Sequence, residues 1–271
     1  MKKPLELDKK VFLKKFEKIS ENFYQKLCDY ISNPNDENIH DIRVSIRRLE
    51  CAYQILPKDV RKQEKIKEYV KKTKTLFKLN ARIRDFDIIC ANMESRYPDK
   101  TQDLVLALKN SKIEQIRNAN KLALKLSRLC IPKITKSSIK KSKLKKRYFK
   151  VLDEIILDIQ KNVIIALGDE RKINELHVLR KDFKKLRYSL ELASDKNTTH
   201  EILQDLKNIQ DVLGEIHDSD IIIDHLRMEK SARYSEIIAE EVLQRSKKYY
   251  TFVAAFKKNP KAVNLDLQFQ H

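Results

Sequence analysis

The sequence HDIRVSIRRL at residues 40–49 has a second version, HVLRKDFKKL, at residues 177–186. A second pair of related segments, RDFDII at residues 84–89 and HDSDII at residues 217–222, follows in the same order. The members of the first pair are 137 residues apart, and those of the second pair 133. Two segments that recur in order at nearly constant separation predict an internal duplication of one structural unit.

The composition predicts that this unit is helical. The chain has 271 residues but only 2 glycines, 6 prolines and no tryptophan. So few glycines cannot serve the tight turns and phosphate loops of most α/β and all-β proteins. With 41% hydrophobic and 36% charged residues, the chain can bury a core and is not globally disordered. The sequence therefore predicts an all-α fold of two four-helix bundles, related by the duplication as a pseudo-twofold pair.

Apolar residues at helical spacing place four helices in each half. The stop signals are Gly168 and five prolines, Pro34, Pro57, Pro98, Pro132 and Pro260. The expected helices are residues 9–31, 36–56, 59–96, 99–129, 144–167, 169–193, 198–230 and 232–258. Residues 132–150 contain nine basic and no acidic side chains, which favours a linker near their start. We therefore expect a first bundle at 1–131, a basic linker at 132–141, a second bundle at 142–260 and a tail at 261–271.

The net charge of +19, from 58 Lys and Arg against 39 Asp and Glu, predicts a polyanionic partner. Residues 1–137 carry 32 basic and 18 acidic side chains, and residues 138–271 carry 26 and 21, so the first half holds +14 of the excess. The longest apolar run, residues 163–167, is too short to span a bilayer. The four cysteines form no CxxC motif, and we interpret them as reduced, buried residues of a cytoplasmic protein.

The positive charge is arranged in rows along single helix faces. His40, Arg43 and Arg47 stand at i, i+3 and i+7, with Arg48 beside them. The second half repeats this row with the residues His177, Arg180, Lys184 and Arg187, flanked by Lys181 and Lys185. A third row follows steps of three and four through Lys67, Lys71, Lys74, Lys78 and Arg82. Cations about 5.4 Å apart suit a repeating linear anion.

A row of this kind, taken alone, is more often the solvated face of an amphipathic helix. Two observations favour a binding role here: acidic i+4 partners are sparse on these faces, and the row led by a histidine recurs. Two Asp-containing segments have two interpretations. Their carboxylates orient neighbouring basic side chains, which we favour, or they hold a metal. The residues are Asp85, Asp87, Asp218 and Asp220.

Together, these repeated segments resemble the CHAD family, the conserved-histidine α-helical domain. Closest to its motifs are LHVLRKDFKKLRY at residues 176–188 and LGEIHDSDI at residues 213–221. The resemblance covers essentially the whole chain and implies two four-helix bundles that bind inorganic polyphosphate without catalysis or cofactor. By position, it implies phosphate contacts from His40, Arg43, Arg47 and Arg48, and from His177, Arg180, Lys184, Lys185 and Arg187. We add Lys74, Lys78 and Arg82 as binding candidates from their row.

The sequence departs from an exact repeat at three places. Glu50 stands where the second copy has Arg187, His217 stands where the first has Arg84, and Asn80-Ala81 replaces Leu213-Gly214. The first two departures argue against equal contributions of the two copies to ligand binding. Some members of the family carry a fused triphosphate-processing domain. This chain has no room for one, so we expect a stand-alone module. We also expect the first half, with its larger net charge, to supply more of the positive electrostatic field.

Two other functions stay open. A general nucleic-acid-binding protein fits the charge, although few aromatics accompany the basic rows and no recognition helix is evident, so nucleic acid is expected only as a non-specific competitor. An HD-type metal phosphohydrolase fits His40-Asp41 and His217-Asp218. However, no histidine lies upstream of His40 to supply a further ligand, and the upstream candidates for His217 are His177 and His200. Polyphosphate-metabolising enzymes as partners and docking on polyphosphate granules are open roles for a polyphosphate-binding protein. No membrane partner is expected.

Overall fold

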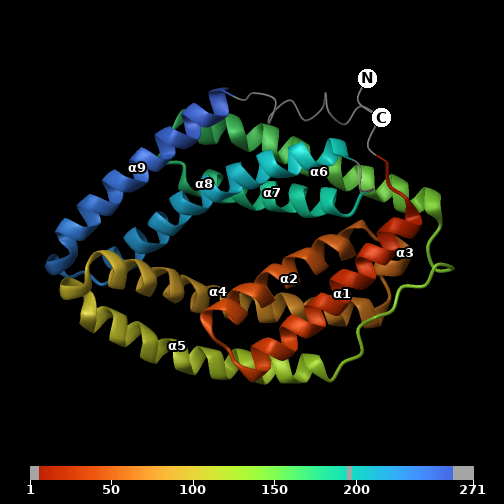
Figure 1. The fold of residues 1–271 in the computed structure, drawn as a ribbon, viewed down its shortest axis with the longest axis horizontal. Helices are drawn as coiled ribbons and strands as arrows, with labels where there is room; N and C mark the ends of the chain where they lie inside the picture. The colour runs from red at the N-terminus through yellow and green to blue at the C-terminus, as the bar shows by residue number, and fades with distance from the viewer. Residues whose placement is uncertain (1–5, 194–196, 259–271) are drawn as a thin grey trace. The chain divides into compact units, whose positions relative to one another are not determined.

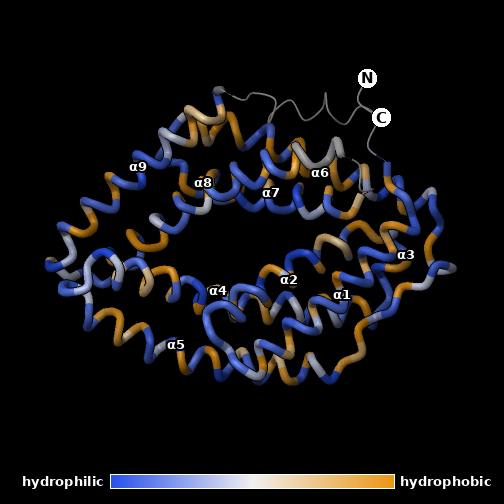
Figure 2. The backbone as a smooth tube through the Cα atoms, in the orientation of Figure 1, coloured by the Kyte–Doolittle hydropathy of each residue, from blue (hydrophilic) through white to orange (hydrophobic). Residues whose placement is uncertain are grey.

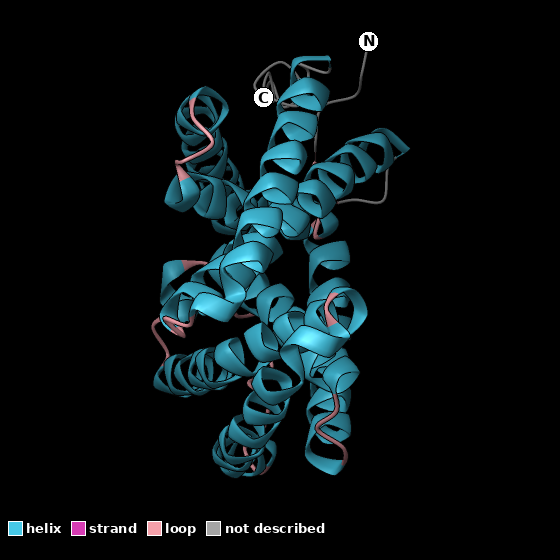
Figure 3. Ribbon diagram, turned by 90° about the vertical axis from the view of Figure 1, so that its left-hand side faces the viewer, coloured by secondary structure: helices cyan, strands magenta, loops and turns pink. Residues whose placement is uncertain are grey.

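The computed structural model describes residues 6–193 and 197–258, without the side chains of residues 197–201 and 258. This part of the chain is all-α, as predicted (Figure 3). Its helices are joined mostly by short loops, and the longest described connection is residues 128–140, between α5 and α6. The helices are α1 (Lys9–Ser32), α2 (Asp36–Ile55), α3 (Lys58–Arg61), α4 (Glu64–Arg96), α5 (Pro98–Ser127), α6 (Lys141–Gly168), α7 (Ile173–Glu191), α8 (Asn197–Met228), the 3-10 helix η1 (Ala232–Tyr234) and α9 (Ser235–Lys258). The proposed tail at 261–271 lies outside the described residues.

Most helix ends agree with the sequence-based boundaries within a few residues, and local chemistry explains the starts of α2 and α5. At the start of α2, the Asn35 side chain accepts a hydrogen bond of 2.8 Å from the backbone N–H of Asn38. Asp36 and Glu37 in the first turn complement the positive end of the helix dipole. Pro98 opens α5, where its missing N–H leaves no hydrogen bond unmade.

Three details of the helix prediction are wrong. The expected helix at 59–96 is interrupted, and Gln63 adopts an extended conformation between α3 and α4. The break allows both Val60 and Ile66 to be buried, and no proline or glycine marks it in the sequence. The expected helix at 232–258 begins with η1 instead of an α-helical turn. Gly168 ends α6 without the left-handed conformation of a glycine cap, since no described glycine has a positive φ.

The contacts within the chain divide it into two compact units, which are described separately. The N-terminal unit is Lys9–Tyr148, and the C-terminal unit combines the chain before Lys9 with the chain from Phe149 onward. The division falls within α6. In both units, hydrophobic and hydrophilic segments alternate along the helices, as expected for amphipathic helices that bury one face (Figure 2).

In the N-terminal unit, α1 packs on α2, α2 on α4, α4 on α5, and α5 on α1 (Figure 1). The predicted apolar face of α1 is buried in this core, including Phe12, Phe23 and Leu27. Burial of each such side chain contributes about 1.5–3 kcal/mol. The apolar face of α2 is buried as well, so the basic row on its other face is left at the edge of this core.

In the C-terminal unit, α7 packs on α8 and α8 on α9. The Tyr249 hydroxyl of α9 donates a hydrogen bond of 3.0 Å to the Ala166 carbonyl of α6. Phe183 and Leu186 of α7 are fully buried, which confirms the predicted apolar face of this helix. As in the N-terminal unit, burial of that face leaves the basic row of the helix toward its polar side.

The cysteine interpretation holds in part. All four cysteines are free thiols, and Cys51 and Cys90 are buried. Cys130, however, is exposed, because it lies in the segment that follows α5. Over the described residues, none of the helices has a stretch that is long and apolar enough to cross a membrane.

Lys230, two residues after α8, has a φ of +50°, which is unfavourable for a residue with a Cβ. Replacing Lys230 with glycine should therefore increase the free energy of unfolding by about 1 kcal/mol. Lys230→Ala is the matched control, because alanine keeps the Cβ and the strain. Urea unfolding of both variants tests this, and equal stabilities would contradict it.

Candidate anion-binding surface

Two arginines of the basic row of α2 contact α4 directly. Arg43 donates a hydrogen bond of 2.9 Å from Nη1 to the Phe77 carbonyl oxygen, and its guanidinium lies 4.3 Å from the centroid of the Phe77 ring. The Arg47 guanidinium lies 4.9 Å from the same centroid. These cation–π contacts hold two arginines of α2 against α4, on which Lys74 and Lys78 are exposed three residues before and one residue after Phe77. The structure therefore brings two of the predicted rows together.

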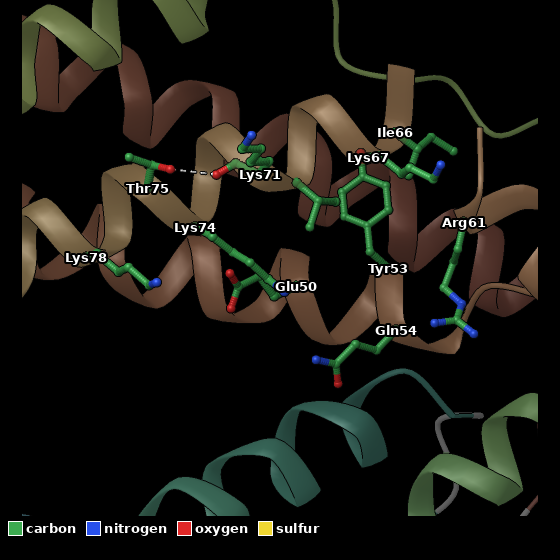
Figure 4. A pocket seen from close by; sticks show the side chains of 11 residues that line it. Glu50, Tyr53, Gln54, Arg61, Ile66, Lys67, Lys71, Lys74, Thr75 and Lys78 are labelled. Carbon is green, nitrogen blue, oxygen red and sulfur yellow. Dashed lines mark hydrogen bonds between the residues drawn. The ribbon is translucent and has the colours of Figure 1, made fainter. Parts of the chain in front are cut away.

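A pocket of about 500 Å³ opens beside this contact, within the N-terminal unit. Its walls come from α2, α3 and α4 (Figure 4). Four lysines of α4 and one arginine of α3 line it together with apolar and neutral side chains. The lining residues are Glu50, Tyr53, Gln54, Arg61, Ile66, Lys67, Val70, Lys71, Lys74, Thr75 and Lys78. A volume of this size is within the range of small-ligand sites.

One carboxylate, Glu50, lies among these cations, and Figure 4 shows its side chain next to that of Lys74. Burial raises the pKa of the Glu50 carboxyl above its usual range. The positive charges of Lys74 and Arg47 act in the opposite direction without cancelling the effect of burial. The sequence marked Glu50 only as a departure from the repeat. Its place in the pocket depends on the packing of α2 against α4.

Three further candidates lie outside this pocket. His40 is exposed, and it precedes Arg43 by about one turn of α2. Arg48 is half-buried on α2. Arg82 is exposed one turn beyond Lys78, with its guanidinium 5.4 Å from the centroid of the Phe86 ring on the same helix. Arg82 thus continues the α4 row, whereas Arg61, Lys67 and Lys71 extend it in the other direction.

In the C-terminal unit, a pair of histidines joins α7 to α8. The Nδ1 atoms of His177 and His217 are 3.1 Å apart, and their ring centroids are 4.4 Å apart. A hydrogen bond between these atoms requires that one Nδ1 carry a proton and the other accept it. Sequence reasoning selected His177 as a phosphate contact, and noted His217 as a replacement for arginine and as part of a possible HD-type dipeptide. Their contact follows from the packing of α7 on α8.

Arg180 and Lys184 are half-buried on α7. A Cβ placed on Gly214 of α8 would lie 4.0 Å from Arg180 Nε, so the arginine passes close to the backbone of α8. Arg180 and Arg43 therefore take similar positions, each against the long helix that follows its own.

The two remaining candidates have acidic partners on their own helix, and that of Arg187 has the i+4 spacing that we expected to be sparse. Lys185 Nζ lies 2.7 Å from Oδ1 of the buried Asp182. Arg187 Nε lies 3.6 Å from Glu191 Oε1, and its guanidinium lies 5.1 Å from the Tyr188 centroid. Both cations are partly compensated within α7, which reduces the charge they offer to a bound anion.

An aspartate of the repeated segments forms buried ion pairs that hold helices together. In the N-terminal unit, Lys112 of α5 forms ion pairs with Asp36 and, at 2.5 Å, with Asp87, whose side chain is 1% exposed. Arg84 adds a longer contact of 3.9 Å to Asp87. Burial raises the pKa of Asp87, and Lys112 acts in the opposite direction. Asp87 is thus a structural partner of cations, as we favoured.

The C-terminal unit contains a corresponding arrangement. Arg245 of α9 donates from Nε to Asp220 Oδ1 at 2.8 Å, and its Nη1 lies 4.0 Å from Glu170 Oε2. Burial raises the pKa of Asp220, and Arg245 lowers it by a smaller amount. In the described residues, no group of three or more His, Cys, Asp or Glu side chains is arranged to hold a metal ion. The side chain of His200 lies outside them.

The described chain is thus an all-α protein in which a helix of each unit, α2 or α7, carries a basic row against the next long helix. Comparison with known proteins identifies the family. The sequence model of the CHAD domain family matches residues 19–227 of this chain. The chain therefore belongs to the CHAD family.

A solved structure supports the fold. The crystal structure of the CHAD domain from the plant Ricinus communis is similar with a TM-score of 0.59 at 15% sequence identity. The similarity covers 97% of this chain and 91% of the plant chain. At this identity, the likeness concerns the fold alone. No curated protein matches the chain by sequence.

Proposed function

We propose that this protein binds inorganic polyphosphate without chemically changing it, through basic rows on helices of both units. The observation that carries the proposal is the contact of Arg43 and Arg47 of α2 with Phe77 of α4, the helix whose basic row includes Lys74 and Lys78. These contacts restrain the two arginine side chains, so they lose less entropy when they bind an anion. Membership in the CHAD family, which is generally thought non-catalytic and is linked to polyphosphate, points the same way.

The repetition of the rows supports a linear ligand. On α2 and α4, the cations follow one another at about one helical turn, and α7 carries a corresponding row. A compact anion would occupy one or two of these positions, whereas a chain of phosphates can contact several in succession. Each additional contact releases condensed counterions, which strengthens binding at low salt.

We also propose that the two units arose by duplication of one four-helix bundle, with boundaries near 1–131 and 142–260. The buried ion pairs support this proposal. Asp87 and Lys112 have counterparts in Asp220 and Arg245, each exactly 133 residues later in the sequence. Asp36 and Glu170, which complete the two clusters, are 134 residues apart. The same interaction thus connects corresponding helices in the two units.

A titration with long-chain polyphosphate at two salt concentrations tests the function. If about four phosphates are neutralised, the logarithm of affinity should fall with the logarithm of salt with a slope of about −3. The affinity would then decrease roughly 60-fold between about 50 and 200 mM salt. Fluorescence anisotropy or calorimetry measures this slope, and absence of binding at the lower salt would contradict the proposal.

Competition and product assays separate the other functions. Binding of polyphosphate should survive competition by an excess of DNA, because the rows are not accompanied by stacking platforms for bases. Displacement by DNA would favour a general nucleic-acid-binding protein instead. Release of phosphate from polyphosphate or nucleotides on addition of divalent metal would show a phosphohydrolase. Docking on granules and recruitment of a polyphosphate-metabolising enzyme are proposed consequences of binding.

A further inference from the structure

The pocket of the N-terminal unit has one feature that its row of cations does not explain. Glu50 is the only carboxylate among its lining residues. On a surface that binds a polyanion, an ionised carboxylate at this position repels the ligand, at short range and with limited screening by solvent. Removal of its charge would therefore favour the bound state.

The charges around Glu50 come from every helix that lines the pocket. Arg47 is on α2 itself, and Arg61 of α3 is held by a 2.8 Å hydrogen bond from Nε to the Leu56 carbonyl. The α4 wall contributes Lys71, Lys74, Lys78 and Lys67, and the Nζ of Lys67 lies 2.6 Å from Oε1 of the exposed Glu64. Arg147, at the start of α6, donates at 3.1 Å to the carbonyl of Gln54, another lining residue. None of the lining residues comes from α1, on the other side of α2.

We propose that this pocket binds phosphate groups of the polyanion and that Glu50 takes up one proton when the anion enters. The proposal rests on the proposed function and adds Arg61, Lys67 and Lys71 to its site. In the bound state, the protonated carboxyl has an O–H that donates a hydrogen bond to a phosphate oxygen. The repulsive group of the free pocket thereby becomes a donor.

The effect of pH follows by linkage. Burial already raises the pKa of Glu50 in the free protein, and a bound anion raises that pKa further. Between the free and the bound pKa, binding is accompanied by proton uptake, so the affinity increases as the pH falls, by up to about tenfold per pH unit. The second copy has Arg187 in place of a carboxylate at the corresponding position. Proton-coupled binding is thus expected of the N-terminal pocket alone.

The test is calorimetric titration with long-chain polyphosphate at about pH 6, in buffers of different ionisation enthalpy, which reports the protons taken up per chain. Histidine side chains in general change charge near this pH, so the measured quantity is the difference between the wild type and Glu50→Gln. We expect Glu50→Gln to take up fewer protons, by up to one per chain. At about pH 8 it should bind roughly five- to tenfold more tightly than the wild type.

Glu114→Gln is the matched control, because it removes the same charge from an exposed position on α5 of the same unit. It should leave both the proton uptake and the affinity at about pH 8 within twofold of the wild type. If Glu50→Gln behaves like Glu114→Gln while polyphosphate still binds, the proton-coupled pocket is wrong and the proposed function stands. If no variant binds polyphosphate, both are wrong. Urea unfolding checks the fold of Glu50→Gln, which should be at least as stable as the wild type because a buried charge is removed.

Discussion

Replacing both Lys74 and Lys78 with glutamate should weaken polyphosphate binding by at least about 100-fold at 100 mM salt. The two lysines are exposed and flank Phe77, on which Arg43 and Arg47 are seated. The substitution removes two phosphate contacts and adds two carboxylates to this part of α4. These carboxylates would compete with the ligand for the remaining arginines. Titration of the double variant at two salt concentrations should also show a smaller salt slope.

The control for this experiment is Lys14→Glu/Lys18→Glu. These lysines are also exposed, also one turn apart, and lie on α1 of the same unit away from the pocket. Net charge changes equally in the two double variants, so a general electrostatic attraction would weaken binding equally. A site built from α2 and α4 predicts that the control loses only a few-fold of affinity. Circular dichroism should show unchanged helicity in both.

The second large effect concerns stability. Arg245→Met should lower the free energy of unfolding by about 3–5 kcal/mol. Arg245 and Asp220 both have side chains that are 8% exposed, and their Nε and Oδ1 atoms are 2.8 Å apart. Loss of the guanidinium leaves the Asp220 carboxylate buried without its cation, which costs more than the ion pair itself contributes. Chemical denaturation measures the change.

A double variant distinguishes this mechanism from loss of packing. Asp220→Leu/Arg245→Met removes the buried carboxylate as well, and it should recover most of the stability lost in Arg245→Met. If the double variant is as unstable as the single one, the cost comes from packing of the arginine stem. Glu94→Gln, which breaks the exposed pair of Glu94 with Lys109, should show no measurable change.

The helices were predictable because their signals are local. The periodicity of apolar residues, Asn35 at the start of α2 and Pro98 at the start of α5 act within one or two turns. The interruption between α3 and α4 could not be predicted, because no breaker residue marks it. It depends on burial of Val60 and Ile66 in a core contributed by other helices.

The sequence predicted which cations lie in a row along each helix, but not how the rows of different helices lie relative to one another. Arg43, Arg47, Lys74 and Lys78 were selected from their spacing along α2 and α4. The contact of both arginines with Phe77, which joins the two rows, has no signal in either helix taken alone. Glu50 was visible as an exception to the repeat, but its chemical meaning required the pocket around it.

The sequence alone determined the all-α class, the positions of most helices and the membership in the CHAD family, because these depend on neighbours a few residues apart and on repeated motifs. Only the tertiary structure decided which cations share a surface, that His177 meets His217, and that Lys112 and Arg245 are held by buried aspartates. These contacts join residues 25–40 positions apart on different helices. Their geometry is set by how apolar faces pack, which no single helix encodes.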